Sequence, residues 1–105
     1  MELQIEKQKI IDYLLKPTGK ADKSKFLNKI GYTTENWEQL RFDIMNQFSG
    51  YYKKVYRKNK YGTLYIINGK LKAPFQIVDI TTIWIKIEEK NYLKLVSLFP
   101  NKKSY

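Results

Sequence analysis

Basic residues and tyrosines are interleaved within one stretch of the chain. Its members are Tyr51, Tyr52, Lys53, Lys54, Tyr56, Arg57, Lys58, Lys60 and Tyr61. Ammonium and guanidinium groups neutralise phosphates, and aromatic rings stack on unpaired bases at roughly 1–3 kcal/mol each. Single-stranded or looped RNA suits such a surface better than regular duplex RNA does, so we expect the stretch to bind RNA. Tyrosine is also an ordinary strand residue, and about half of these rings are expected to pack on helices.

The second chemical feature is a long strand predicted over residues 75–87. Side chains on a strand point alternately to its two faces. One face carries Ile77, Ile83, Ile85 and Ile87, and the other carries Val78, Ile80, Thr82, Trp84 and Lys86. We expect the isoleucine face to meet the core. The face with a hydroxyl, an indole and an ammonium group is then the one on which to look for function, with Trp84 and Lys86 as further RNA contacts.

The next predicted strand, residues 92–99, adds to this second face. If it pairs antiparallel with the long strand, Lys94 approaches Lys86 across the turn, and Ser97 joins them through a bulge or an edge position. RNA cleavage without a metal needs an activated 2′-hydroxyl, a stabilised phosphorane and a protonated 5′-oxygen. A lysine whose pKa is lowered by neighbouring cations can act as the base, and lysine or arginine can hold the phosphorane. The alternative is a basic, solvated sheet face without chemistry.

The amino-acid composition narrows the classes of function and of partner that remain. Twenty basic and ten acidic residues give a net charge of +10, and no acidic residue lies between Asp43 and Asp79, which favours a polyanionic partner. Solubility, an acidic protein partner and a membrane surface are the alternatives. The chain has no cysteine and no histidine, its five glycines are isolated, and no carboxylates are spaced as a metal cluster. We therefore expect no cofactor, no metal and no membrane span, since no apolar run approaches about 20 residues.

These side chains must be positioned by a domain of 105 residues, long enough for one modest core. The apolar spacing predicts helices over residues 6–15, 21–30 and 34–47. Gly31 is expected to end the second helix. Thr33 or Thr34 is expected to cap the third, and Trp37 is expected to lie in the core. Strands are predicted over residues 51–59, 63–68, 70–72, 75–87 and 92–99, and Asn68-Gly69 is a typical hairpin turn.

The predicted order of elements indicates the α+β class. N-terminal helices, about three, pack on one face of an antiparallel sheet of about four strands. We expect a single domain with a helical half at residues 1–49, a β-meander at 50–100 and a loose tail at 101–105.

Short motifs spread over residues 7–100 follow a recurring pattern. They are Lys23-Ser-Lys-Phe26, Ile30-Gly-Tyr-Thr33, Asn36-Trp37-Glu-Gln-Leu40, Tyr61-Gly62 with Tyr65, Thr82-Ile-Trp84-Ile, and Lys94-Leu-Val-Ser-Leu-Phe-Pro100. The pattern resembles a family of small uncharacterised bacterial domains, found alone or at the C-termini of large secreted polymorphic toxins. The chain departs from it at Leu27, Lys94, Ser97 and Phe99. Lys94 stands where the pattern has arginine, so a planar fork on phosphate becomes a point charge.

Helices followed by an antiparallel sheet also resemble the barnase/EndoU/colicin/RelE-like ribonuclease superfold. That resemblance implies an endoribonuclease toxin that acts in the cytoplasm, either made there or delivered as a secreted toxin domain, and that an acidic antitoxin or immunity protein inhibits. It implies catalytic roles for Lys23, Tyr61, Thr82, Lys94 and Ser97, in a RelE-like site without histidine. A non-catalytic RNA-binding module and a basic protein-interaction domain are the alternatives.

Overall fold

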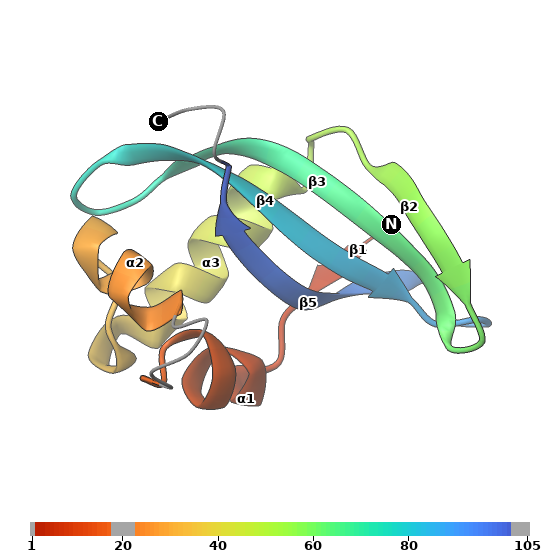
Figure 1. Cartoon of the computed structure of the whole chain (residues 1–105), viewed down its shortest axis with the longest axis horizontal. Coiled ribbons are helices and arrows are strands. Elements are labelled where there is room, and N and C mark those ends of the chain that lie inside the picture. Colours follow the sequence, from red (N-terminus) through yellow and green to blue (C-terminus); the bar gives the residue numbers. More distant parts are fainter. Residues whose placement is uncertain (1, 18–22, 102–105) are drawn as a thin grey trace.

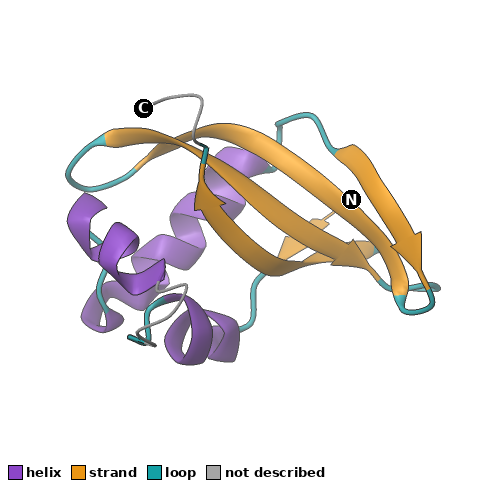
Figure 2. Cartoon of the chain, in the orientation of Figure 1, coloured by secondary structure: helices purple, strands orange, loops and turns teal. Residues whose placement is uncertain are grey.

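The computed structural model describes residues 2–17 and 23–101, with helices on one side of a five-stranded sheet (Figures 1 and 2). The elements in chain order are β1 (Glu2–Gln4), α1 (Lys7–Lys9), η1 (Ile10–Leu14), α2 (Lys23–Ile30), η2 (Thr34–Asn36), α3 (Trp37–Phe48), β2 (Lys54–Asn59), β3 (Gly62–Lys72), β4 (Ile77–Lys86) and β5 (Tyr92–Pro100). The segment η1 is a π-helix and η2 is a 3₁₀ helix. The predicted α+β class is confirmed.

The sheet has the strand order β1-β5-β4-β3-β2. All neighbours are antiparallel except β1, which runs parallel to β5 and pairs Leu3 with Leu93. Both of these leucines are buried, so the first residues of the chain extend the sheet and its core. This fifth strand was not counted in the sequence-based estimate of four. No helix in the described part of the chain is both long enough and apolar enough to cross a membrane.

The helices follow local sequence signals. Before α3, the Thr33 hydroxyl accepts a hydrogen bond from the Glu35 backbone N–H (3.2 Å), and the Asn36 side chain accepts one from the Thr33 N–H (2.7 Å). These bonds satisfy donors that a helix start leaves open, so Thr33 is the predicted cap. Gly31 follows α2 with a φ of +112°, a conformation that glycine adopts without strain. Positions 21 and 22 of the predicted second helix lie outside the described residues.

The prediction for the two faces of β4 was wrong. Trp84 and Thr82 are fully buried beneath the helices, whereas Ile77 on the other face is 59% exposed. Both faces of this strand are largely apolar, so alternation separates them without saying which one the helices cover. The Thr82 hydroxyl donates to the Ile67 carbonyl oxygen (2.8 Å) and accepts from the Trp84 indole N–H (2.6 Å). The polar groups on the core face therefore satisfy one another.

The predicted hairpin at Asn68-Gly69 was also wrong. Both residues lie inside β3, where Gly69 pairs with Ile80 of β4, and the chain turns only at residues 73–76. A Cβ atom at Gly69 would lie 2.1 Å from the Tyr51 ring, whose hydroxyl donates to the Lys70 carbonyl oxygen (2.9 Å). The glycine is thus required for close approach of a ring and not for a turn.

Candidate functional site

The edge of β5 beyond Lys94 is the place where chemically useful side chains converge. β1 pairs only with residues 92–94, and no described strand pairs with the outer edge of β5 after that point. The first helical segment is tied to this edge at two points instead. Glu6 forms an ion pair with Lys94, and the hydroxyl groups of Tyr13 and Ser97 lie 3.2 Å apart in a hydrogen bond.

Two lysines flank the Tyr13 ring. The Lys9 ammonium lies 4.9 Å from the ring centroid and the Lys23 ammonium lies 5.8 Å from it. Lys23, the first described residue of α2, is also 5.7 Å from the centroid of the Phe99 ring. We call Lys9, Tyr13, Lys23, Ser97 and Phe99 the β5-edge cluster. It joins three segments that are far apart in the sequence, and both of its rings are 41% exposed.

The Glu6–Lys94 pair adjoins the cluster. Glu6, Lys9 and Lys94 line a cavity of about 290 Å³ together with apolar side chains of β4 and β5. The hydrogen bond from Lys94, followed by its charge, holds the pKa of the Glu6 carboxyl below its usual value of 4.5. The same hydrogen bond raises the pKa of Lys94. Glu6 is therefore a carboxylate and Lys94 an ammonium ion at neutral pH.

The five predicted catalytic residues do not form one site. Lys23 and Ser97 belong to the β5-edge cluster, and Lys94 lies beside it in its ion pair with Glu6. Tyr61 lies in the turn between β2 and β3, 65% exposed, at the opposite end of the molecule from α2 (Figure 1). Thr82 is buried in the core. Neither residue can act with the cluster, because one is remote from it and the other has no access to solvent.

Replacing Thr82 with valine is expected to reduce the free energy of unfolding by roughly 1–3 kcal/mol. Valine keeps the branched shape but leaves the buried Trp84 indole N–H and the Ile67 carbonyl without their shared partner. Urea unfolding followed by tryptophan fluorescence measures the change. The matched variant is Thr63→Val, at a half-buried position near the hairpin, where a small change is expected. Equal effects in both variants would contradict the role given to Thr82.

The predicted RNA-binding residues separate into structural and exposed groups. Trp84 is in the core, Tyr51 packs edge-on against Phe48 (4.9 Å between ring centroids), and the Lys53 ammonium donates to the Ser49 carbonyl (2.8 Å). Lys86 lies on β4 and is half-buried. The rest lie on or beside β2 and its turn, and we call the exposed residues there the hairpin arm: Tyr52, Lys54, Tyr56, Arg57, Lys58, Lys60 and Tyr61. One tyrosine of the four in this stretch packs inward, fewer than the half that we expected.

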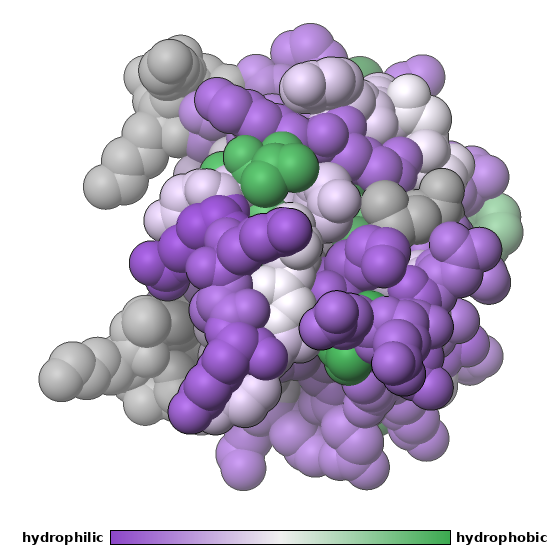
Figure 3. All heavy atoms as spheres, turned by 90° about the vertical axis from the view of Figure 1, so that its right-hand side faces the viewer, coloured by the Kyte–Doolittle hydropathy of each residue, from purple (hydrophilic) through white to green (hydrophobic). Residues whose placement is uncertain are grey.

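The hairpin arm presents cations and rings together. The Arg57 guanidinium lies 5.3 Å from the Tyr56 ring centroid, and the Lys60 ammonium lies 5.2 Å from that of Tyr61. Lys58, the half-buried Lys86 and Glu88 line a cavity of about 260 Å³ beside the turn between β2 and β3. Figure 3 looks onto this end of the molecule, and its surface is largely hydrophilic. Each feature suits a phosphate backbone with unpaired bases.

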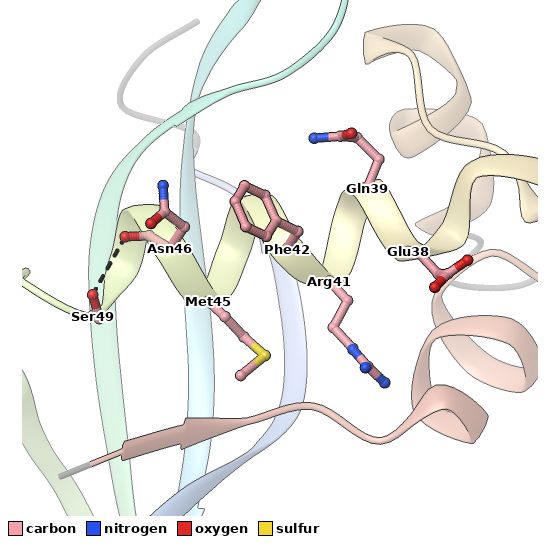
Figure 4. Close-up of a pocket in the computed structure, with 7 residues that line it drawn as sticks. All are labelled: Glu38, Gln39, Arg41, Phe42, Met45, Asn46 and Ser49. Carbon is pink, nitrogen blue, oxygen red and sulfur yellow. Dashed lines mark hydrogen bonds between the residues drawn. The ribbon is translucent and has the colours of Figure 1, made fainter.

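The largest hollow of those described, about 680 Å³, lies along α3 (Figure 4). Arg41 and Met45 project from one side of the helix, and Phe42 and Asn46 from another. The Arg41 guanidinium lies 5.3 Å from the Trp37 ring centroid. Trp37, predicted to lie in the core, is half-buried and packs against the core from its border. Glu38 is the one carboxylate lining the hollow, so it offers no acid–base pair.

Sequence reasoning missed Glu6, Lys9 and Tyr13. Their spacing of three and four residues places them on one face of a helix, next to the buried Ile10 and Leu14. That signal was present in the sequence but is common to any solvated helix face. Within residues 2–17 and 23–101, no three acidic side chains gather in the way that a metal ion requires.

Comparison with known proteins gives one finding. A model of one protein family, described as "Domain of unknown function (DUF6883)", matches residues 1–102 of the chain. No curated protein and no solved structure matches it.

Proposed function

The chain belongs to the DUF6883 family, and we propose that it is an endoribonuclease of bacterial toxin type that cleaves RNA without a metal ion. The observation that carries the proposal is the β5-edge cluster. Two ammonium groups flank a phenol there, and the phenol is hydrogen-bonded to a second hydroxyl group. In the cleavage of a phosphodiester, cations stabilise the charge that develops around phosphorus and a proton donor protonates the leaving oxygen. The cluster brings both kinds of group together.

The reaction requires the 2′-hydroxyl oxygen to attack phosphorus while the bond to the 5′-oxygen breaks. The products are a 2′,3′-cyclic phosphate and a free 5′-hydroxyl group. Lys9 and Lys23 stabilise the negative charge of the phosphorane, and Ser97 donates a hydrogen bond to it. Tyr13 gives its proton to the 5′-oxygen. Tyr13 thus stands in place of Tyr61, for which the resemblance implied a catalytic role.

The base in this scheme is Glu6, which accepts the proton of the 2′-hydroxyl group. Glu6 immediately precedes α1 and Tyr13 lies in η1, with Lys9 between them in the sequence. Lys94 keeps Glu6 ionised by lowering the pKa of its carboxyl. The base is therefore ionised throughout the neutral range. The proton that it takes from the 2′-hydroxyl group passes to solvent after the 5′-oxygen has left, and Tyr13 regains its proton from solvent.

The hairpin arm supplies binding in this proposal. Its exposed tyrosines stack on bases, and its lysines and Arg57 neutralise phosphates. The arm and the β5-edge cluster lie toward opposite ends of the molecule (Figure 1), so an extended single strand is the form of RNA that reaches both. Such a substrate places the site of action in a bacterial cytoplasm. A binding module without cleavage is the second candidate, because the arm needs nothing from the cluster.

Incubation with total bacterial RNA and isolated transfer RNA in EDTA tests the proposal. The parent protein is expected to give discrete fragments with cyclic phosphate ends, and Lys9→Ala/Lys23→Ala is expected to give none. The matched control is Lys58→Ala/Lys60→Ala in the hairpin arm, which removes the same charge and should weaken binding while keeping cleavage at saturating RNA. Intact RNA that shifts on a gel would overturn cleavage and favour the binding module. If the RNA is neither cleaved nor shifted, both candidate functions are overturned.

A further inference from the structure

The face of the sheet opposite the helices has an apolar centre. Figure 2 shows the helices on one side of the sheet only. On the other side, Leu64 pairs with Ile85 and Ile66 pairs with Ile83, so four branched side chains of β3 and β4 lie next to one another. All four are half-buried, and the helices lie on the opposite side of the sheet. Ile85 also lines the cavity that Glu6, Lys9 and Lys94 border. We call this surface the outer face.

The outer face has a basic border. In β2, Lys54 pairs with Ile66 and Arg57 pairs with Leu64, so two cations lie beside the apolar pairs on the same face. No acidic residue occurs between Asp43 and Asp79 to offset them, and Asp79 itself forms an ion pair with Lys70 (3.0 Å). An apolar patch with a cationic border is complementary to an apolar stripe flanked by carboxylates.

RNA and a second copy fit the outer face less well. Bases need aromatic rings for stacking, whereas the centre of this face is aliphatic and the Phe99 ring lies at the β5 edge. Two copies stacked face to face would bring like-charged borders together in a protein of net charge +10. An acidic protein segment is therefore the partner that fits the outer face best.

We propose that the outer face docks an acidic amphipathic helix of a partner protein. Its apolar residues cover the pairs Leu64–Ile85 and Ile66–Ile83, and its carboxylates reach Lys54 and Arg57. Ser97 and Phe99 lie on the same face, opposite Ile83 and Thr81, so the docked helix extends to the β5-edge cluster. It follows, on the proposed function, that this partner inhibits RNA cleavage by covering the cluster.

A displayed library of helical peptides is the probe. Each peptide keeps apolar residues at helical spacing, and its other positions vary among Glu, Lys, Gln and Ser. Selection on the parent protein, with counter-selection on Ile66→Thr/Ile83→Thr, is expected to enrich glutamate-rich peptides. Their affinity is expected to fall at least about tenfold in Ile66→Thr/Ile83→Thr and in Lys54→Gln/Arg57→Gln, and to weaken with salt.

Phe42→Ser on α3 is the matched control, because it removes an exposed apolar side chain from another surface. Enrichment of lysine-rich or uncharged peptides, loss of binding in Phe42→Ser alone, or no enrichment would each overturn the proposal. Because the chain has no cysteine, a fluorophore on Asn68→Cys can report docking even if Ile66→Thr/Ile83→Thr does not fold. The same fluorophore on Asn46→Cys of α3 should not respond. Peptides that dock on the outer face without slowing cleavage would contradict inhibition but not docking.

Discussion

Replacing Tyr13 with phenylalanine is expected to slow RNA cleavage by roughly 10²- to 10⁴-fold, the usual contribution of a proton donor placed at the leaving group. The variant keeps the ring that lies between Lys9 and Lys23, so their positions over it are retained. Only the hydroxyl group and its hydrogen bond to Ser97 are lost. Single-turnover cleavage of a short RNA measures the effect. Tyr56→Phe in the hairpin arm, which removes an exposed hydroxyl group, is the control and should cleave normally.

A substrate with sulfur in place of the 5′-oxygen tests the same role chemically. A thiolate leaves without taking up a proton, so Tyr13→Phe should cleave this substrate about as fast as the parent protein does. Lys23→Ala should be slow on both substrates, because the phosphorane charge forms in either case. If Tyr13→Phe is equally slow on the oxygen and sulfur substrates, Tyr13 positions the cluster and is not the proton donor.

Replacing Tyr32 with phenylalanine is expected to reduce the free energy of unfolding by roughly 1.5–3 kcal/mol at pH 7, the range for hydrogen bonds to charged groups. Tyr32 follows α2 and is fully buried, and its hydroxyl donates to the Asp43 carboxylate of α3 (2.6 Å). The Gln39 side chain donates to the other carboxylate oxygen (2.7 Å). Phenylalanine leaves Asp43 with one side-chain donor fewer in a buried position.

The Tyr32 bond also predicts how stability depends on alkaline pH. Burial, followed by the hydrogen bond to Asp43 and its charge, raises the pKa of Tyr32 well above its usual value of 10.0. Above that pH the unfolded chain loses the phenol proton while the folded protein keeps it. The contribution of Tyr32 is therefore complete below about pH 10 and declines as the pH rises further. Urea unfolding from pH 7 to 11 should show a steeper decline for the parent than for Tyr32→Phe. Tyr52→Phe, at an exposed position, should behave like the parent.

Local signals in the sequence accounted for the element types. The spacing of Trp37, Leu40, Ile44 and Phe48 predicted α3. Thr33 caps the 3₁₀ segment η2 that leads into α3, through bonds between near neighbours. The turn after Gly31 likewise depends on one backbone angle. Exposure of the hairpin arm followed from its charges, because lysine and arginine are rarely buried without partners. These features depend on residues close together in the chain.

The sequence by itself determined the α+β class, the helices and the basic arm. Which face of β4 became core was decided only by the tertiary structure, because both faces are apolar and the helices covered the one with Trp84. The tertiary structure also decided where the candidate site lies. Tyr13 and Ser97 are 84 positions apart in the sequence. They meet because β1 pairs only with the first part of β5, and the first helical segment contacts the remaining edge. Periodicity assigns side chains to faces within one element. Contact between elements depends on their packing, which no local pattern encodes.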